Sequence, residues 1–89
     1  MKRTVEERIR RQIESCVREI QRRNGNSRVR LRPAMRLQDP QLGLDSLDIA
    51  EVFVWIEKTY GVASGDAKGF PHTWRDVISA ITMHQQEYA

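Results

Sequence analysis

The chain has 89 residues, 39% of them apolar and 30% charged, which suits a single compact helical domain with a small core. Such a domain leaves little room for a deep catalytic cleft, so an autonomous enzyme is disfavoured. The longest unbroken apolar run, residues 52–56, is too short to cross a membrane, and residues 1–7 lack the apolar core of a signal peptide. We therefore expect a cytoplasmic protein without a membrane partner.

The charges are distributed unevenly along the chain. Residues 1–36 hold twelve Lys and Arg against four Glu, a net charge of +8, whereas residues 37–89 hold three against eight acidic residues, a net charge of −5. Basic segments can bind nucleic-acid phosphates. Here no recognition motif accompanies the arginines, and four glutamates interrupt them: Glu6, Glu7, Glu14 and Glu19. We expect a solvated helix face and no nucleic-acid partner.

Neither a disulfide nor a metal site is expected. Cys16 is the only cysteine, and it lies on an apolar stripe, where a small core thiol is favoured over a nucleophile. His72 and His84 are twelve residues apart and have no partner ligands at metal-binding spacing.

A first helix is predicted over residues 4–23. Apolar residues recur there at three- and four-residue steps and form one stripe of Val5, Ile9, Ile13, Cys16, Val17 and Ile20. Asn24-Gly25-Asn26 is a strong stop signal for this helix. Residues 24–45 show no helical period and contain Pro33 and Pro40, so a long loop is predicted there.

The central helix is predicted over residues 46–60. Either Asp45 or Ser46 caps it, and Asp48 falls in the first turn, where the helix dipole favours a carboxylate. The core face comprises Ile49, Val52, Phe53, Ile56 and Tyr60. Leu47, Ala50 and Val54 form a second row, here called the apolar strip, which is flanked by Asp48, Glu51 and Glu57. The apolar strip is either a second core contact or an exposed docking surface.

Trp55, on the same predicted helix, is open to two interpretations. The preceding loop shields its ring, or the ring contacts a partner.

The remaining elements complete the expected fold. One helical turn is predicted near residues 64–68, and a last helix over residues 73–87 begins with Thr73 and Asp76 as a capping pair. Its core stripe comprises Trp74, Val77, Ile78 and Ile81. The chain is thus predicted to be all-α, a small four-helix bundle of three main helices and one short helix with a long first loop.

The stretch Leu42-Gly43-Leu44-Asp45-Ser46-Leu47-Asp48 opens the central helix. Leu-Gly-x-Asp-Ser-Leu before an amphipathic helix resembles the attachment site of acyl carrier proteins, and the similarity continues through residues 48–62 and, more weakly, 73–81. The resemblance covers most of the chain after residue 36, and it is poor in the basic first half, where carrier proteins are usually acidic. It implies one carrier domain over residues 1–89 whose first loop crosses the bundle. The residues that would anchor this loop here are Val29, Leu31, Met35 and Leu37.

The resemblance implies that Ser46 carries 4′-phosphopantetheine, with Asp45 and Leu47 beside the attachment point. A helix N-terminus suits the anionic phosphodiester, and the thiol of the arm would carry acyl groups as thioesters for fatty acid, polyketide or related biosynthesis. No catalytic residue is then needed. The implied partners are a phosphopantetheinyl transferase and acyl-processing enzymes such as a ketosynthase or acyltransferase, and a monomer is expected. These partners would dock at Asp48, Ala50, Glu51, Val54 and Glu57.

Two alternatives stay open. Peptidyl and aminoacyl carriers usually have a different residue, often Gly, before the acid or histidine that precedes the serine, so Leu44-Asp45 fits acyl carriers better. A helical adaptor without a covalent cofactor would share the fold and the apolar strip, but its serine would never be modified.

Overall fold

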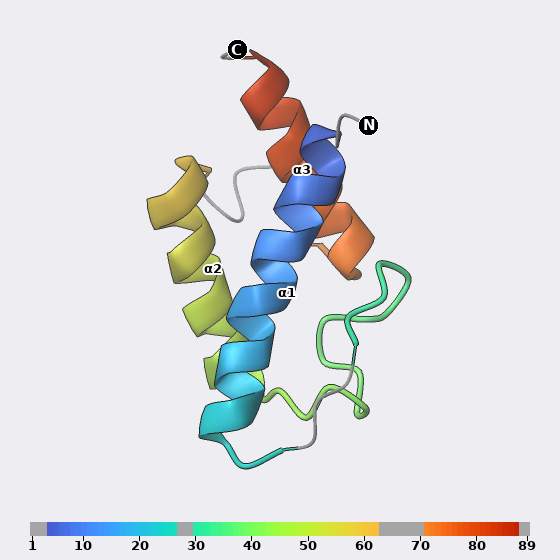
Figure 1. Cartoon of the computed structure of the whole chain (residues 1–89), viewed down its shortest axis with the longest axis vertical. Coiled ribbons are helices and arrows are strands. Elements are labelled where there is room, and N and C mark those ends of the chain that lie inside the picture. The colour runs from blue at the N-terminus through green and yellow to red at the C-terminus, as the bar shows by residue number, and fades with distance from the viewer. Residues whose placement is uncertain (1–3, 27–29, 63–70, 88–89) are drawn as a thin grey trace.

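The computed structural model of the chain describes residues 4–26, 30–62 and 71–87. Within these ranges it has three helices and no strand: α1 (Val5–Arg23), α2 (Ser46–Tyr60) and α3 (Trp74–Glu87). Helix α1 crosses in front of α2 and α3 and contacts both (Figure 1). The all-helical prediction is therefore confirmed as a small bundle, and the short helix predicted at residues 64–68 lies outside the described residues. None of the described helices combines the length and apolar character needed to span a membrane.

Helix α1 begins and ends close to its predicted bounds because its local signals are strong. The Thr4 side chain accepts a hydrogen bond from the N–H of Glu7 at 3.1 Å and caps the helix. At the other end Asn24 is the C-cap, and Gly25 follows with a φ of 74°, a conformation that glycine adopts without strain. The buried apolar side chains of α1 are Ile9, Ile13, Val17 and Ile20.

Two residues of the predicted α1 stripe are less buried than expected. Val5 is 36% exposed because it sits at the first position of the helix, at the edge of the stripe. Cys16 is half-buried at the boundary between α1 and α2, where it packs against the edge of the core. The apolar period alone does not distinguish such edge positions from the centre of the stripe.

Helix α2 is held at both ends by backbone geometry that its sequence specifies. Asp45 is the N-cap and forms a capping box with Asp48, in which each side chain accepts a hydrogen bond from the backbone of the other residue. Gly61 closes the helix with a φ of 74°. The buried apolar residues Ile49, Val52, Phe53 and Ile56 are those predicted, and Tyr60 is half-buried.

The segment between α1 and α2 is fastened to the start of α3. The N–H of Leu37 donates to the carbonyl of His72, and the N–H of Trp74 donates to the carbonyl of Met35. Thr73 and Asp76 exchange the predicted capping hydrogen bonds, and the N–H groups of His72 and Thr73 hold the pKa of Asp76 below its ordinary value. This segment buries five apolar side chains: Leu31, Met35, Leu37, Leu42 and Leu44. Three of the four predicted anchors are thus confirmed, and Val29 lies outside the described residues.

Ile56 should be a strong contributor to stability, because its side chain is 2% exposed in the centre of the bundle. We expect Ile56→Ala to leave a cavity and to lower the free energy of unfolding by about 2–5 kcal/mol in urea titrations. Val54→Ala is the matched control on the same helix, because Val54 is 49% exposed, and it should change stability by about 0.5 kcal/mol or less. Equal effects of the two variants would contradict the assigned core face.

Candidate functional site

Ser46 is the first residue of α2 and is exposed to solvent. Asp45, not Ser46, provides the N-cap: its carboxylate accepts from the N–H of Asp48 at 2.8 Å. The Ser46 hydroxyl forms no hydrogen bond within the described residues. It therefore lies free at the end of a helix where the first N–H groups lack intrahelical acceptors and the dipole favours an anion.

Three polar side chains at the end of α1 hold the segment that leads into α2, and we call them the α1 latch. Gln21 Nε2 donates to the carbonyl of Leu42 at 3.0 Å, and Asn26 Nδ2 donates to the carbonyl of Gly43 at 3.1 Å. Asn24 Nδ2 donates to Asp48 Oδ2 at 3.0 Å. The α1 latch thus connects the end of one helix to the residues on both sides of Ser46.

Gly43 is required by this arrangement for two reasons. Its φ of 68° lies in the left-handed region that residues with a side chain rarely adopt. A Cβ at this position would also lie 2.8 Å from Nδ2 of Asn26, closer than atoms pack. The glycine in the attachment motif therefore permits both the turn into α2 and the contact with the α1 latch.

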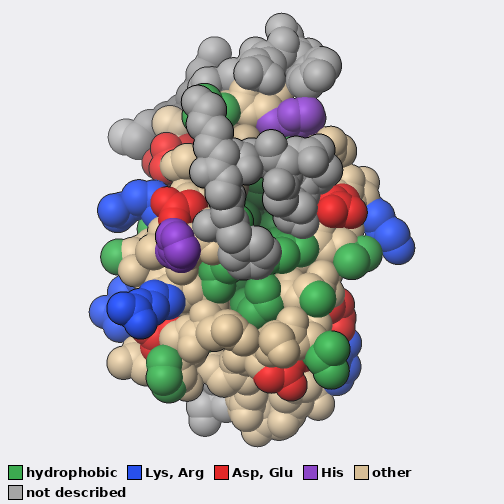
Figure 2. Space-filling view, turned by 180° about the vertical axis from the view of Figure 1, so that it is seen from behind, with side chains coloured by type: hydrophobic (Ala, Val, Ile, Leu, Met, Phe, Trp, Pro, Cys, Tyr) green, Lys and Arg blue, Asp and Glu red, His purple; other side chains and the backbone are tan. Residues whose placement is uncertain are grey.

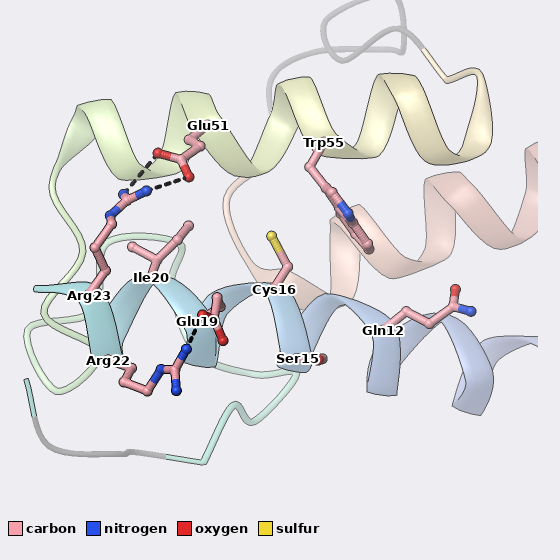
Figure 3. Close-up of a pocket in the computed structure, with 9 residues that line it drawn as sticks. All are labelled: Gln12, Ser15, Cys16, Glu19, Ile20, Arg22, Arg23, Glu51 and Trp55. Carbon is pink, nitrogen blue, oxygen red and sulfur yellow. Dashed lines mark hydrogen bonds and ion pairs between the residues drawn. The ribbon is translucent and has the colours of Figure 1, made fainter.

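An ion pair joins the same two helices beside the α1 latch. Both guanidinium nitrogens of Arg23 donate to the two carboxylate oxygens of Glu51 at 2.9 Å (Figure 3), and Arg23 also lies 3.7 Å from Asp48. The hydrogen bonds from Arg23 hold the pKa of the Glu51 carboxyl below its ordinary value. Both side chains are about half exposed, so solvent screens this pair and it contributes little to stability.

The sequence predicted that Asp48 borders the apolar strip at the surface, and this prediction is wrong. It is only 7% exposed, because the capping box turns its carboxylate back to the N–H of Asp45 and because Asn24 covers it. The other predicted docking residues are exposed: Ala50, Glu51, Val54 and Glu57. Leu47 is 79% exposed. In the view of the molecule from behind, hydrophobic side chains alternate with charged ones on the side formed by α2 (Figure 2). The apolar strip is therefore exposed and makes no second core contact.

A groove of about 630 Å³ separates α1 from α2. Cys16 and Ile20 lie in it from α1, and Trp55 points into it from α2 (Figure 3). Trp55 is half-buried, packs against the edge of the core and meets the ring of Tyr60 edge-on at 5.7 Å.

The Cys16 thiol has an environment that makes it a poor nucleophile. Its burial, with a smaller effect from the Glu51 carboxylate, raises its pKa to about 11, so the thiol is protonated at neutral pH. The described residues also contain no group of three or more His, Cys, Asp or Glu side chains able to hold a metal ion.

The sequence patterns identified Ser46, Asp45 and Leu47 but missed the residues that position them. Gln21 is 1% exposed, although a glutamine beside an apolar stripe is usually solvated. Asn24 and Asn26 were interpreted only as a helix stop.

Comparison with known proteins finds no matching family model, no similar curated protein and no similar solved structure.

The α1 latch predicts an unusually costly substitution at Gln21. Gln21→Leu keeps most of the side-chain volume but leaves the buried carbonyl of Leu42 without its donor, so we expect unfolding free energy to fall by about 1–3 kcal/mol. Gln38→Leu is the control, because Gln38 is exposed and such surface changes usually stay within about 0.5 kcal/mol. If both variants unfold at the wild-type urea concentration, Leu42 does not depend on Gln21.

Proposed function

We propose that the chain is an acyl carrier protein whose Ser46 carries 4′-phosphopantetheine. The observation that supports this most directly is the exposed, unbonded Ser46 hydroxyl at the first position of α2, directly after its Asp45 cap. Ser46 thus occupies the position that the Leu-Gly-x-Asp-Ser-Leu motif requires for a modified serine.

The chemistry of the position fits such a cofactor. A phosphodiester on Ser46 stays anionic, and it would lie beside the free N–H groups at the start of α2. A transferase would break the pyrophosphate bond of coenzyme A, join phosphopantetheine to the Ser46 oxygen, and release the adenosine bisphosphate. The enzyme supplies the acid and base, so the carrier only has to present an accessible hydroxyl. Cys16, with its raised pKa, is not expected to compete for acyl groups.

Two other functions fit the same geometry. A peptidyl or aminoacyl carrier would use Ser46 in the same way and would differ only in the group that it carries, which the mass of the loaded protein identifies. A helical adaptor would use the exposed apolar strip alone, and its Ser46 would never be modified.

Modification of Ser46 is the decisive test of a carrier function. After incubation with coenzyme A and a broad-specificity phosphopantetheinyl transferase, we expect intact mass to increase by one phosphopantetheine group. Ser46→Ala should gain nothing, whereas Ser15→Ala, a change of another exposed serine, should gain the same mass as the wild type. No mass gain in the wild type, or the same gain in Ser46→Ala, would exclude the proposal.

We also propose that partner enzymes dock on the apolar strip. Leu47 follows Ser46 directly and is 79% exposed, so an active site that reaches the Ser46 hydroxyl must approach Leu47 as well. Charge steering should be weaker here than on an acidic carrier, since Asp48 is buried and Glu51 is paired with Arg23. Apolar contact then provides more of the binding energy than the acidic border does.

Leu47→Ala tests this docking surface without affecting the core. We expect kcat/KM for the transferase to fall about tenfold, the loss typical of an interface anchor worth more than ~1 kcal/mol, while stability stays unchanged. Met83→Ala removes a similarly exposed apolar side chain from α3 and should leave kcat/KM unchanged. If both variants are modified at the wild-type rate, the docking surface lies elsewhere.

A further inference from the structure

Four arginines lie on the side of α1 that faces away from the core. Arg8, Arg11, Arg18 and Arg22 are all exposed, and their spacing along the helix places them in one row. We call this row of four arginines the arginine stripe. Exposed Ser15 lies within the row, between Arg11 and Arg18. With the rise of an α-helix the arginine stripe is about 21 Å long.

The positive charge of the arginine stripe is only partly compensated within the described chain. Arg22 pairs with Glu19 at 2.5 Å, but Arg11 and Arg18 form no ion pair with any described residue. Exposed guanidinium groups without carboxylate partners are available to another molecule.

All basic residues described before α2 are arginines and none is a lysine. A guanidinium group can bind a carboxylate through two parallel hydrogen bonds, as Arg23 does with Glu51. Arginine is also enriched at protein interfaces, where lysine is depleted. This composition favours a surface that recognises carboxylates over a surface that only keeps the protein in solution.

The arginine stripe borders the groove between α1 and α2 (Figure 3). Arg22 and Ser15 belong to both, and Cys16, Ile20 and Trp55 provide the apolar surface of the groove. Arg22 and Arg23 edge the groove together with their partners Glu19 and Glu51. Tryptophan and arginine are the residues in which interaction hot spots are enriched.

We propose that the arginine stripe and the groove together bind a partner protein through an acidic helix that places carboxylates along the stripe and one apolar side chain in the groove. Nucleic acid fits less well, because a phosphate backbone offers no apolar side chain for Cys16, Ile20 and Trp55 in the groove beside the stripe. The interaction does not depend on modification of Ser46, because the arginine stripe lies on a different helix.

The probe for this surface is a synthetic helical peptide with glutamates at the spacing of the arginines and one leucine facing the groove. By fluorescence anisotropy, the wild type should bind it about tenfold or more tightly than the same peptide with glutamines. Arg11→Glu with Arg18→Glu should abolish this preference, whereas Arg36→Glu with Arg75→Glu, which changes net charge equally at other exposed arginines, should keep it.

The lysine variant distinguishes recognition of carboxylates by paired hydrogen bonds from attraction between opposite charges alone. Arg11→Lys with Arg18→Lys keeps the charge but loses the paired hydrogen bonds, so it should weaken peptide binding while circular dichroism shows an unchanged fold. No preference of the wild type for the glutamate peptide, or the same loss in the control variant, would overturn the proposal. A mixed-sequence DNA duplex that binds more tightly than the peptide would also overturn it.

Discussion

The backbone carbonyls of Leu42 and Gly43 lie outside regular structure, directly before α2, and both take their hydrogen-bond donors from the end of α1. Because a buried carbonyl group is costly without a donor, the buried contact between Gln21 and Leu42 holds the segment in place, and the exposed contact between Asn26 and Gly43 adds to it. Asn24 adds a third contact on the far side of Ser46, at Asp48. The exposed Ser46 thus lies at the start of a helix whose flanking residues are held on both sides, an arrangement that keeps this serine in one position.

The same contacts determine which charges of α2 a partner can meet. Asp48 lies in the first turn, where the helix dipole and Asn24 both stabilise it, but this role removes it from the surface. Glu51 stays at the surface, yet Arg23 compensates its charge. The exposed surface at the start of α2 therefore consists of Leu47 and the Ser46 hydroxyl more than of acidic groups.

Local signals in the sequence predicted most of the fold. Helical period, the Asn24-Gly25-Asn26 stop and the Thr73 cap act within one or two turns, so the three helices begin and end within one residue of their predicted bounds. The long-range polar contacts were not predictable, since nothing near Gln21 indicates that it reaches a carbonyl twenty-one residues away. The wrong prediction that Asp48 is exposed has the same origin. A helical projection gives the direction in which a residue points, but it does not show that the carboxylate of a capping residue turns back to the backbone N–H before the helix.

Arg23 connects the two proposed surfaces, because it lines the groove beside the arginine stripe and also pairs with Glu51 on α2. A partner carboxylate at the edge of the groove would compete with Glu51 for this guanidinium. Because the pair is exposed and screened by solvent, the exchange costs little. The buried contacts of Gln21 and Asp48 are worth more, because breaking them leaves desolvated polar groups without partners. If a partner bound to α1 took Arg23, as we propose, the α1 latch would still keep Ser46 in place.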